Sequence, residues 1–146
     1  MDHVAIMKKS LKLLPKILSK EKTIESRWYV SRRSPWKRIK EGDRVFFKNA
    51  GELITVKADV EKVVEFEITQ ESQLREIIEK YGGKGKICFS GSNEEVFNWA
   101  KEKRYCILIF LKEPVKIEPF EINKEGFGNA CAWLTLEDIE KIKHEL

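Results

Sequence analysis

Three residues of complementary charge, Lys22, Glu25 and Arg27, lie within one short segment of the sequence. Residues 23–30 are typical of a strand, and residues two apart on a strand project from the same face, so we expect Glu25 and Arg27 to be paired there. Such a pair could line a partly closed cleft and leave spare arginine N–H donors for a ligand. Lys22 lies at the turn before the strand, from which it could reach the mouth of the same cleft. The alternative is a structural cluster of ion pairs that holds a helix against the sheet.

Aromatic and basic side chains alternate directly after this segment. Such a mixture suits single-stranded nucleic acid, because aromatic rings stack on exposed bases while arginine and lysine contact phosphates. Trp28 and Trp36 could equally pack against the sheet, and we assign Trp99 and Trp133 to the core. The candidate nucleic-acid-binding residues are Lys22, Glu25, Arg27, Trp28, Arg32, Arg33, Trp36, Lys37 and Arg38.

Charge is distributed unevenly along the 146 residues, whose net charge is +4. Residues 1–48 contain 14 basic and 5 acidic side chains, whereas residues 49–146 contain 14 basic and 19 acidic ones. The segment 20–48, which includes the candidate residues, contains 10 basic and 4 acidic side chains. A basic N-terminal third indicates an anionic partner, most commonly RNA or another nucleic acid, although it could also be a solvated face.

The sequence predicts no metal site and no cofactor. The two histidines, His3 and His144, lie near opposite ends of the chain, and no two histidines or cysteines have the spacing of zinc ligands. The three cysteines, Cys88, Cys106 and Cys131, lie in apolar surroundings, and we expect them to be reduced, buried thiols of a cytoplasmic protein.

Further features concern localisation and source. The longest apolar run, residues 105–111, is far shorter than the roughly 18 residues of a membrane helix, so we expect no membrane partner. The first residues lack the charge order of a secretory signal, which also favours the cytoplasm. The heavy use of lysine and glutamate is typical of thermophilic proteins, in which surface ion-pair networks gain value.

The elements that must position these residues follow from the hydrophobic periodicity. Strand patterns cover residues 4–7, 23–30, 44–48, 53–68, 105–111 and 116–122. Helical patterns begin at residue 10, cover residues 69–81 and 92–100, and begin again at residue 135. Because strands occur on both sides of a helical insertion at about residues 69–104, we expect a single domain, 1–146, that is mainly β (α+β): a β-barrel with a helical insertion and flanking helices.

Residues 20–27 resemble the signature of the ASCH domain, a PUA-like β-barrel family whose pattern is Gly-x-Lys-x-x-Glu-x-Arg. Lys22, Glu25 and Arg27 match the charged positions, and Lys20 stands where the family usually has glycine. If that position is left-handed, lysine costs about 1 kcal/mol there. Residues 40–47 resemble the family's Gly-Asp turn entering a barrel strand, and the similarity continues to residues 126–134, so that it covers nearly the whole chain.

The resemblance implies a PUA-like pseudobarrel and an RNA-binding or nucleic-acid-associated module. It also implies an alternative, because small bacterial members of the superfamily are amidohydrolases of acetylated cytidine that use a lysine, a threonine and a downstream glutamate. Here Glu25 stands at the threonine position, so an amidohydrolase for acylated nucleosides would need a different set, with Lys22 as base. A nuclease, suggested for some relatives, is a third possibility. A nucleoside hydrolase needs a closed pocket around one base, whereas a binding module needs a groove continuous with basic surface.

Overall fold

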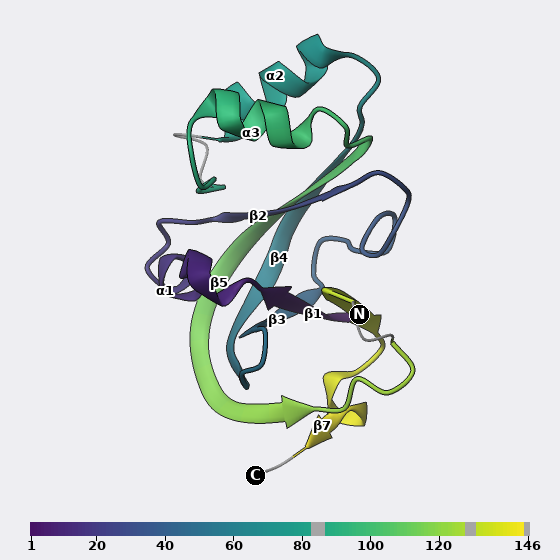
Figure 1. Cartoon of the computed structure of the whole chain (residues 1–146). Helices are drawn as coiled ribbons and strands as arrows, with labels where there is room; N and C mark the ends of the chain where they lie inside the picture. The colour runs from purple at the N-terminus through teal and green to yellow at the C-terminus, as the bar shows by residue number, and fades with distance from the viewer. Residues whose placement is uncertain (83–86, 128–130, 145–146) are drawn as a thin grey trace.

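The structure, a computed structural model, describes residues 1–82, 87–127 and 131–144. One strongly curled sheet dominates it (Figure 1). The strands are β1 (Asp2–Met7), β2 (Ile24–Tyr29), β3 (Arg44–Asn49), β4 (Ile54–Glu67), β5 (Tyr105–Ile122), β6 (Trp133–Leu136) and β7 (Lys143–His144). Their order is β2-β5-β4-β3-β1-β6, β7 pairs with β5, and β1 runs parallel to β3. The strands β2 and β6 are therefore the two edges of the curled sheet. The predicted mainly β, barrel-like architecture is confirmed.

The long antiparallel pair of β4 and β5 produces most of the curl (Figure 1). We expected two separate strands over residues 105–111 and 116–122, but the structure has one continuous strand of 18 residues. A register shift opposite Lys57 and Asp59 accommodates Pro114, and Glu113 next to it has a φ of +52°. A bulge of this kind lets a strand pass a proline and bend without ending.

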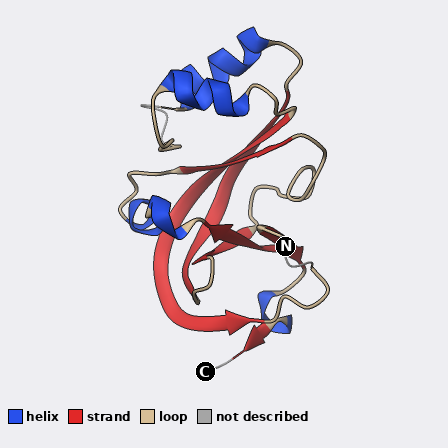
Figure 2. Cartoon of the chain, viewed as in Figure 1, coloured by secondary structure: helices blue, strands red, loops and turns tan. Residues whose placement is uncertain are grey.

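The helices lie around the sheet rather than within it (Figure 2). They are α1 (Leu13–Leu18), α2 (Glu71–Tyr81) and α3 (Asn93–Ala100), with short 3₁₀ turns at Lys9–Leu11 and Ile139–Lys141. The helices α2 and α3 form the predicted insertion between β4 and β5, and α3 begins with the expected capping box of Ser92 and Glu95. The closing helix predicted from residue 135 is wrong: the start of that segment pairs with β1 as part of β6, and a 3₁₀ turn and the short strand β7 follow.

The sheet is buried on both faces. Alternate residues of β5 face different cores: Ile107 and Ile109 pack inside the curl with α1, whereas Leu108 packs under α2 and α3. Trp133 lies in the inner core as predicted, and Trp36 packs against that core. Within the described residues, no helix is long and apolar enough to cross a membrane.

The cysteines are free, as expected, but their burial differs from the prediction. Cys106 is buried, and burial raises the pKa of its thiol. Cys88 and Cys131 are only partly buried. Both lie in irregular segments beside the sheet, where the local apolar sequence does not ensure a covering layer.

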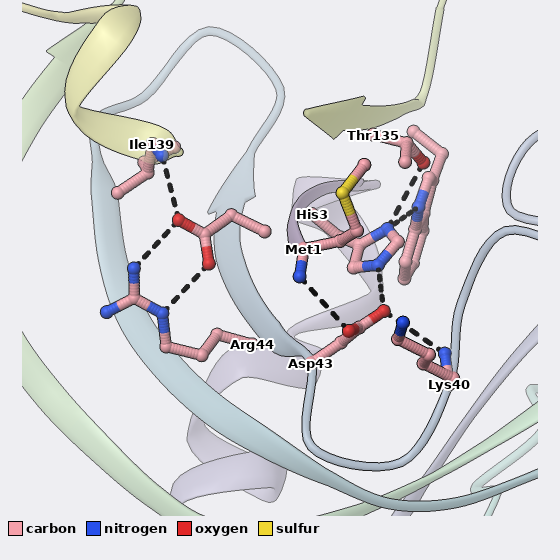
Figure 3. A network of polar contacts seen from close by, with 9 residues as sticks. Met1, His3, Lys40, Asp43, Arg44, Thr135 and Ile139 are labelled. Atoms are coloured by element: carbon pink, nitrogen blue, oxygen red, sulfur yellow. Dashed lines mark hydrogen bonds and ion pairs between the residues drawn. The ribbon is translucent and has the colours of Figure 1, made fainter. Parts of the chain in front are cut away.

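A buried polar network joins β1 to the turn at Gly42 and Asp43 (Figure 3). The Asp43 carboxylate accepts hydrogen bonds from the backbone N–H of Lys40 (3.1 Å) and the α-amino group of Met1 (3.2 Å), and its Oδ2 lies 2.9 Å from His3 Nε2. Burial alone would raise the pKa of Asp43, but the hydrogen bonds lower it below its ordinary value. The Gly-Asp turn seen in the sequence therefore has a structural role at the start of β3.

Beside this network, Arg44 and the backbone N–H of Ile139 donate hydrogen bonds to another buried carboxylate, that of Asp2 on β1 (Figure 3). Asp2 accepts two hydrogen bonds from the Arg44 guanidinium, at 2.8 and 2.7 Å, and one from the backbone N–H of Ile139 at 2.8 Å. A paired fork of this kind joins β1, β3 and the last 3₁₀ turn. It explains why the C-terminal segment returns to the start of the chain.

Candidate functional site

The three charged residues singled out in the sequence lie together. Glu25 and Arg27 project from the same face of β2, and Arg27 Nη2 lies 3.5 Å from Glu25 Oε2. Lys22 Nζ lies 3.6 Å from Glu25 Oε1. All three side chains line one pocket, which we call the Lys22 pocket. The alternation along β2 explains the pairing of Glu25 with Arg27.

Lys22 lies at the floor of this pocket rather than at its mouth. Its side chain is 2% exposed, and Nζ donates hydrogen bonds to the backbone carbonyls of Ile24 and Ile87. Together with the Glu25 carboxylate, these acceptors offset the cost of removing the ammonium group from water. Lys22 therefore ties the segment between α2 and α3, within the helical insertion, to the start of β2.

The turn before Lys22 is left-handed at Lys20, the position where the signature usually has glycine. Lys20 has a φ of +66°, in the left-handed region. Its backbone N–H donates to the Ile17 carbonyl, and that of Lys22 donates to the Lys16 carbonyl, so the turn closes α1 and sets the direction of β2. A glycine would adopt this conformation without the cost that lysine carries.

Arg27 connects the two open edges of the sheet. From β2 its guanidinium donates to the carbonyls of Ile6, at the end of β1, and Ala132, just before β6, each at 3.4 Å. It also lies over the Trp133 ring, with Cζ 5.1 Å from the ring centroid. No ladder of backbone hydrogen bonds joins β2 to β6 in the described residues. Among the described residues, the side-chain hydrogen bonds across this seam between β2 and β6 come from Arg27.

Trp133, whose ring Arg27 contacts, is hydrogen-bonded to the buried polar network of His3 and Asp43. Its Nε1–H donates to His3 Nδ1 at 3.1 Å, which makes Nδ1 an acceptor and leaves Nε2–H to donate to Asp43. The Thr135 hydroxyl lies 3.1 Å from the same Nδ1 (Figure 3). Burial lowers the pKa of His3, which outweighs the opposing effect of Asp43. A neutral His3 therefore positions Trp133 at the seam.

The Lys22 pocket has a volume of about 360 Å³, within the range of small-molecule sites. Its charged floor faces a wall of three aromatic rings. Trp28 contacts both Phe89 and Trp99, with centroids 6.1 Å apart in each pair. Trp28 is buried, but Trp99 is 54% exposed, so its assignment to the core is wrong. Trp99 provides an accessible aromatic face at the rim.

The loop after β2 divides the remaining candidates into two groups. Arg33 and Arg38 line a second pocket of about 370 Å³, which we call the arginine pocket. Arg32 instead lies over the Tyr105 ring at 5.5 Å, and Trp36 packs edge-on against that ring at 5.0 Å. Lys37 lies over Trp36, pairs with Glu65 and lines neither pocket.

The two pockets are neighbours. Tyr29 lines both of them, and Arg27, which lines the Lys22 pocket, contacts Ala132 and Trp133 of the arginine pocket. Burial raises the pKa of Tyr29, although the positive charges of Arg27 and Arg33 act in the opposite direction. A pocket with a polar floor and a pocket with two arginines thus flank the Arg27 seam.

Comparison with known proteins bears on the fold. A scan against family models finds no match, and no curated protein matches the sequence. ASCH from Zymomonas mobilis superposes with a TM-score of 0.65 at 18% identity, covering 96% of this chain and 90% of that chain. Two of its variants give TM-scores of 0.64 and 0.63 at 19% and 18% identity, each covering 96% of this chain and 93% and 91% of theirs. The chain has the ASCH fold.

Within this ASCH fold, the signature residues have the contacts described above. Lys22 anchors Ile87, Glu25 lies between the two cations, and Arg27 closes the seam. Their part in binding a ligand stays a prediction. Of the late segment 126–134, which also resembled the family, residues 128–130 lie outside the described residues.

Sequence reasoning missed the segment 87–90 and Trp99 as walls of the Lys22 pocket. Helical geometry offered a signal for Trp99. Val96, Phe97 and Ala100 are the buried residues of α3, and at 100° per residue Trp99 lies about 105° from the centre of their face. A residue at that angle is at the border of the apolar face, where partial exposure is expected. For residues 87–90 the sequence held no such signal.

Proposed function

We propose that this protein binds single-stranded RNA at the seam between β2 and β6. An unpaired base enters the Lys22 pocket against Trp99, and the loop after β2 contacts the phosphates. The observation that carries this proposal is the junction of an aromatic-walled pocket with basic surface. Such a combination suits single strands, because stacking and phosphate contacts act together.

The charge of the loop supports an anionic partner. Arg32, Arg33 and Arg38 are exposed, and none of them makes an ion pair with a described residue. By contrast, Arg44 and Arg75 each have a carboxylate partner. Free guanidinium groups grouped beside a pocket raise the local concentration of an anion and keep donors available to it.

The aromatic wall supports a base rather than an aliphatic ligand. Trp99 is more than half exposed, and its ring packs against Trp28 with an interplanar angle of 72°. Lys103 Nζ lies 5.3 Å from the Trp99 centroid, which places a positive charge near the same ring. Stacking of a base on such a ring contributes about 1–3 kcal/mol and tolerates different sequences.

The amidohydrolase alternative has weaker support from the geometry of Lys22. A lysine that acts as a base needs a free lone pair directed at the substrate. Here Nζ donates to two backbone carbonyls and lies 3.6 Å from the Glu25 carboxylate, so the amine is already engaged by groups of the protein. This arrangement favours a structural role for Lys22.

Titration of a fluorescein-labelled, unstructured RNA of ten nucleotides at several salt concentrations tests the proposal. Three to five phosphate contacts predict a slope of roughly −2 to −4 in log affinity against log salt. Trp99→Ala is expected to weaken binding by about 1–3 kcal/mol with little change in slope. Val115→Ala, at an exposed apolar residue outside both pockets, is the matched control. Undetectable or salt-independent binding at low ionic strength would reject the proposal.

A further inference from the structure

We infer that the arginine pocket is a phosphate site that acts together with the Lys22 pocket. The ligand is then a phosphorylated nucleotide, free or within RNA, and not a nucleoside. This inference rests on the proposed function and makes it more specific, because it assigns separate pockets to the base and to the phosphate.

The backbone fixes both arginines of the pocket. The N–H of Trp36 donates to the Arg33 carbonyl and the N–H of Arg38 donates to the Pro35 carbonyl, both at 2.8 Å. These two bonds form consecutive turns, with Arg33 at one end and Arg38 at the other. The Arg33 guanidinium also lies over the Tyr29 ring, with Cζ 5.7 Å from the centroid. The two guanidinium groups are therefore brought to one pocket by a defined loop.

The lining of the pocket suits a phosphate group. The described lining residues include two arginines, the Ser34 and Thr135 hydroxyls, and no carboxylate. Each guanidinium has five N–H donors in a planar fork, which matches two phosphate oxygens at once. Thr135 already contacts His3, so we assign the hydroxyl contact to Ser34. An anion with several acceptor oxygens is the ligand that this set of donors can satisfy.

The position of the pocket links it to the base site. The two pockets meet at side chains of the seam: Tyr29 lines both, and Arg27, which lines the Lys22 pocket, contacts residues of the arginine pocket. A base and a nearby phosphate of one ligand can therefore occupy both pockets, whereas a nucleoside fills only one. The phosphate contact adds directly to the affinity for the base.

Direct calorimetric titration separates this inference from RNA binding as such. The probes are adenosine, adenosine 5′-monophosphate, adenosine 3′-monophosphate and inorganic phosphate. We expect at least one monophosphate to bind tenfold or more tightly than adenosine, and inorganic phosphate to bind more weakly than that monophosphate. Equal affinity for adenosine and both monophosphates would overturn the inference, even if the labelled RNA binds. Inorganic phosphate that binds as tightly as the nucleotides would overturn the link between the pockets.

Variants in the same loop give a matched comparison. Arg33→Gln and Arg38→Gln are expected to abolish the advantage of the monophosphate over adenosine. Arg32→Gln removes the same charge from the same exposed loop, but Arg32 lies over Tyr105 and outside the arginine pocket, so it is expected to keep that advantage. An equal loss in all three variants would indicate general electrostatic attraction and would overturn a defined phosphate site.

Discussion

The buried His3 makes the stability of this protein depend on pH in a range where few other groups titrate. Its side chain is 0% exposed, and Nδ1 accepts the N–H of Trp133 while Nε2 donates to Asp43. Protonation of His3 at Nδ1 would place its new N–H group against the Nε1–H group of Trp133. Burial accordingly lowers the pKa of His3 below the ordinary value of 6.5.

The direction and size of the effect follow from proton linkage. Below pH 6.5 the unfolded chain binds a proton at His3 that the folded chain does not, so stability is full above this pH and falls as pH decreases. If folded His3 stays neutral, the loss between pH 7.5 and 5.5 is about 1.4 kcal/mol, which is an upper limit. The lowered pKa values of Asp2 and Asp43 keep their contributions constant there, because those are lost only near and below 3.8.

Urea unfolding followed by tryptophan fluorescence measures this loss. For an m value of about 2 kcal/mol/M, the midpoint is expected to fall by up to roughly 0.7 M between the two pH values. His3→Gln can keep one donor and one acceptor but does not titrate, so its midpoint is expected to change less with pH. His144→Gln, at the exposed second histidine, is the control and is expected to keep the full wild-type dependence. Equal stability of the wild type at both pH values, or an unchanged dependence in His3→Gln, would refute the reasoning.

Two further predictions concern the turn and the seam. Lys20→Gly is expected to raise the stability by about 0.5–1 kcal/mol and the Tm by about 2–5 °C, because Lys20 has a φ of +66°. Lys16→Gly, within α1, is the control and is expected to lower the stability. Thermal unfolding of both variants checks this, and a destabilised Lys20→Gly would contradict it. Arg27→Lys keeps the charge but loses the planar fork that reaches Ile6 and Ala132, so urea unfolding should show a loss of about 1–2 kcal/mol; wild-type stability in Arg27→Lys would show that the bridge contributes nothing.

The parts of the site that depend on local spacing could be predicted from the sequence. Alternation along one strand correctly predicted that Glu25 and Arg27 share a face, and the glycine of the signature raised a left-handed conformation of Lys20 as a possibility. The depth of Lys22 could not be predicted, because the carbonyl of Ile87 that binds it comes from the connection between α2 and α3, 65 residues along the chain. The seam could not be predicted either, since it depends on which strands become the edges of the sheet.

The fold was predicted in outline for a similar reason. Capping and apolar periodicity are local, and they correctly located α2 and α3. The continuous β5 and the strand β6 were missed because each is stabilised by a partner distant in sequence, β4 in one case and β1 in the other. Pro114 and the helix-like residues after Thr135 favour other structures when the segments are considered alone.

The closure by Arg27 means that this barrel can be strengthened from outside. A ligand that contacts the loop after β2 and the residues beside β6 contacts both edges of the sheet, so its binding adds a further connection between them. By mass action, a free ligand at 100 times its Kd that binds only the form with both edges held together stabilises that form by about 2.7 kcal/mol. Hydrogen exchange should then slow most at the amides of the edge strand β6, far along the chain from the arginines that hold the ligand. Occupancy of the site could thus be measured as protection of an edge strand.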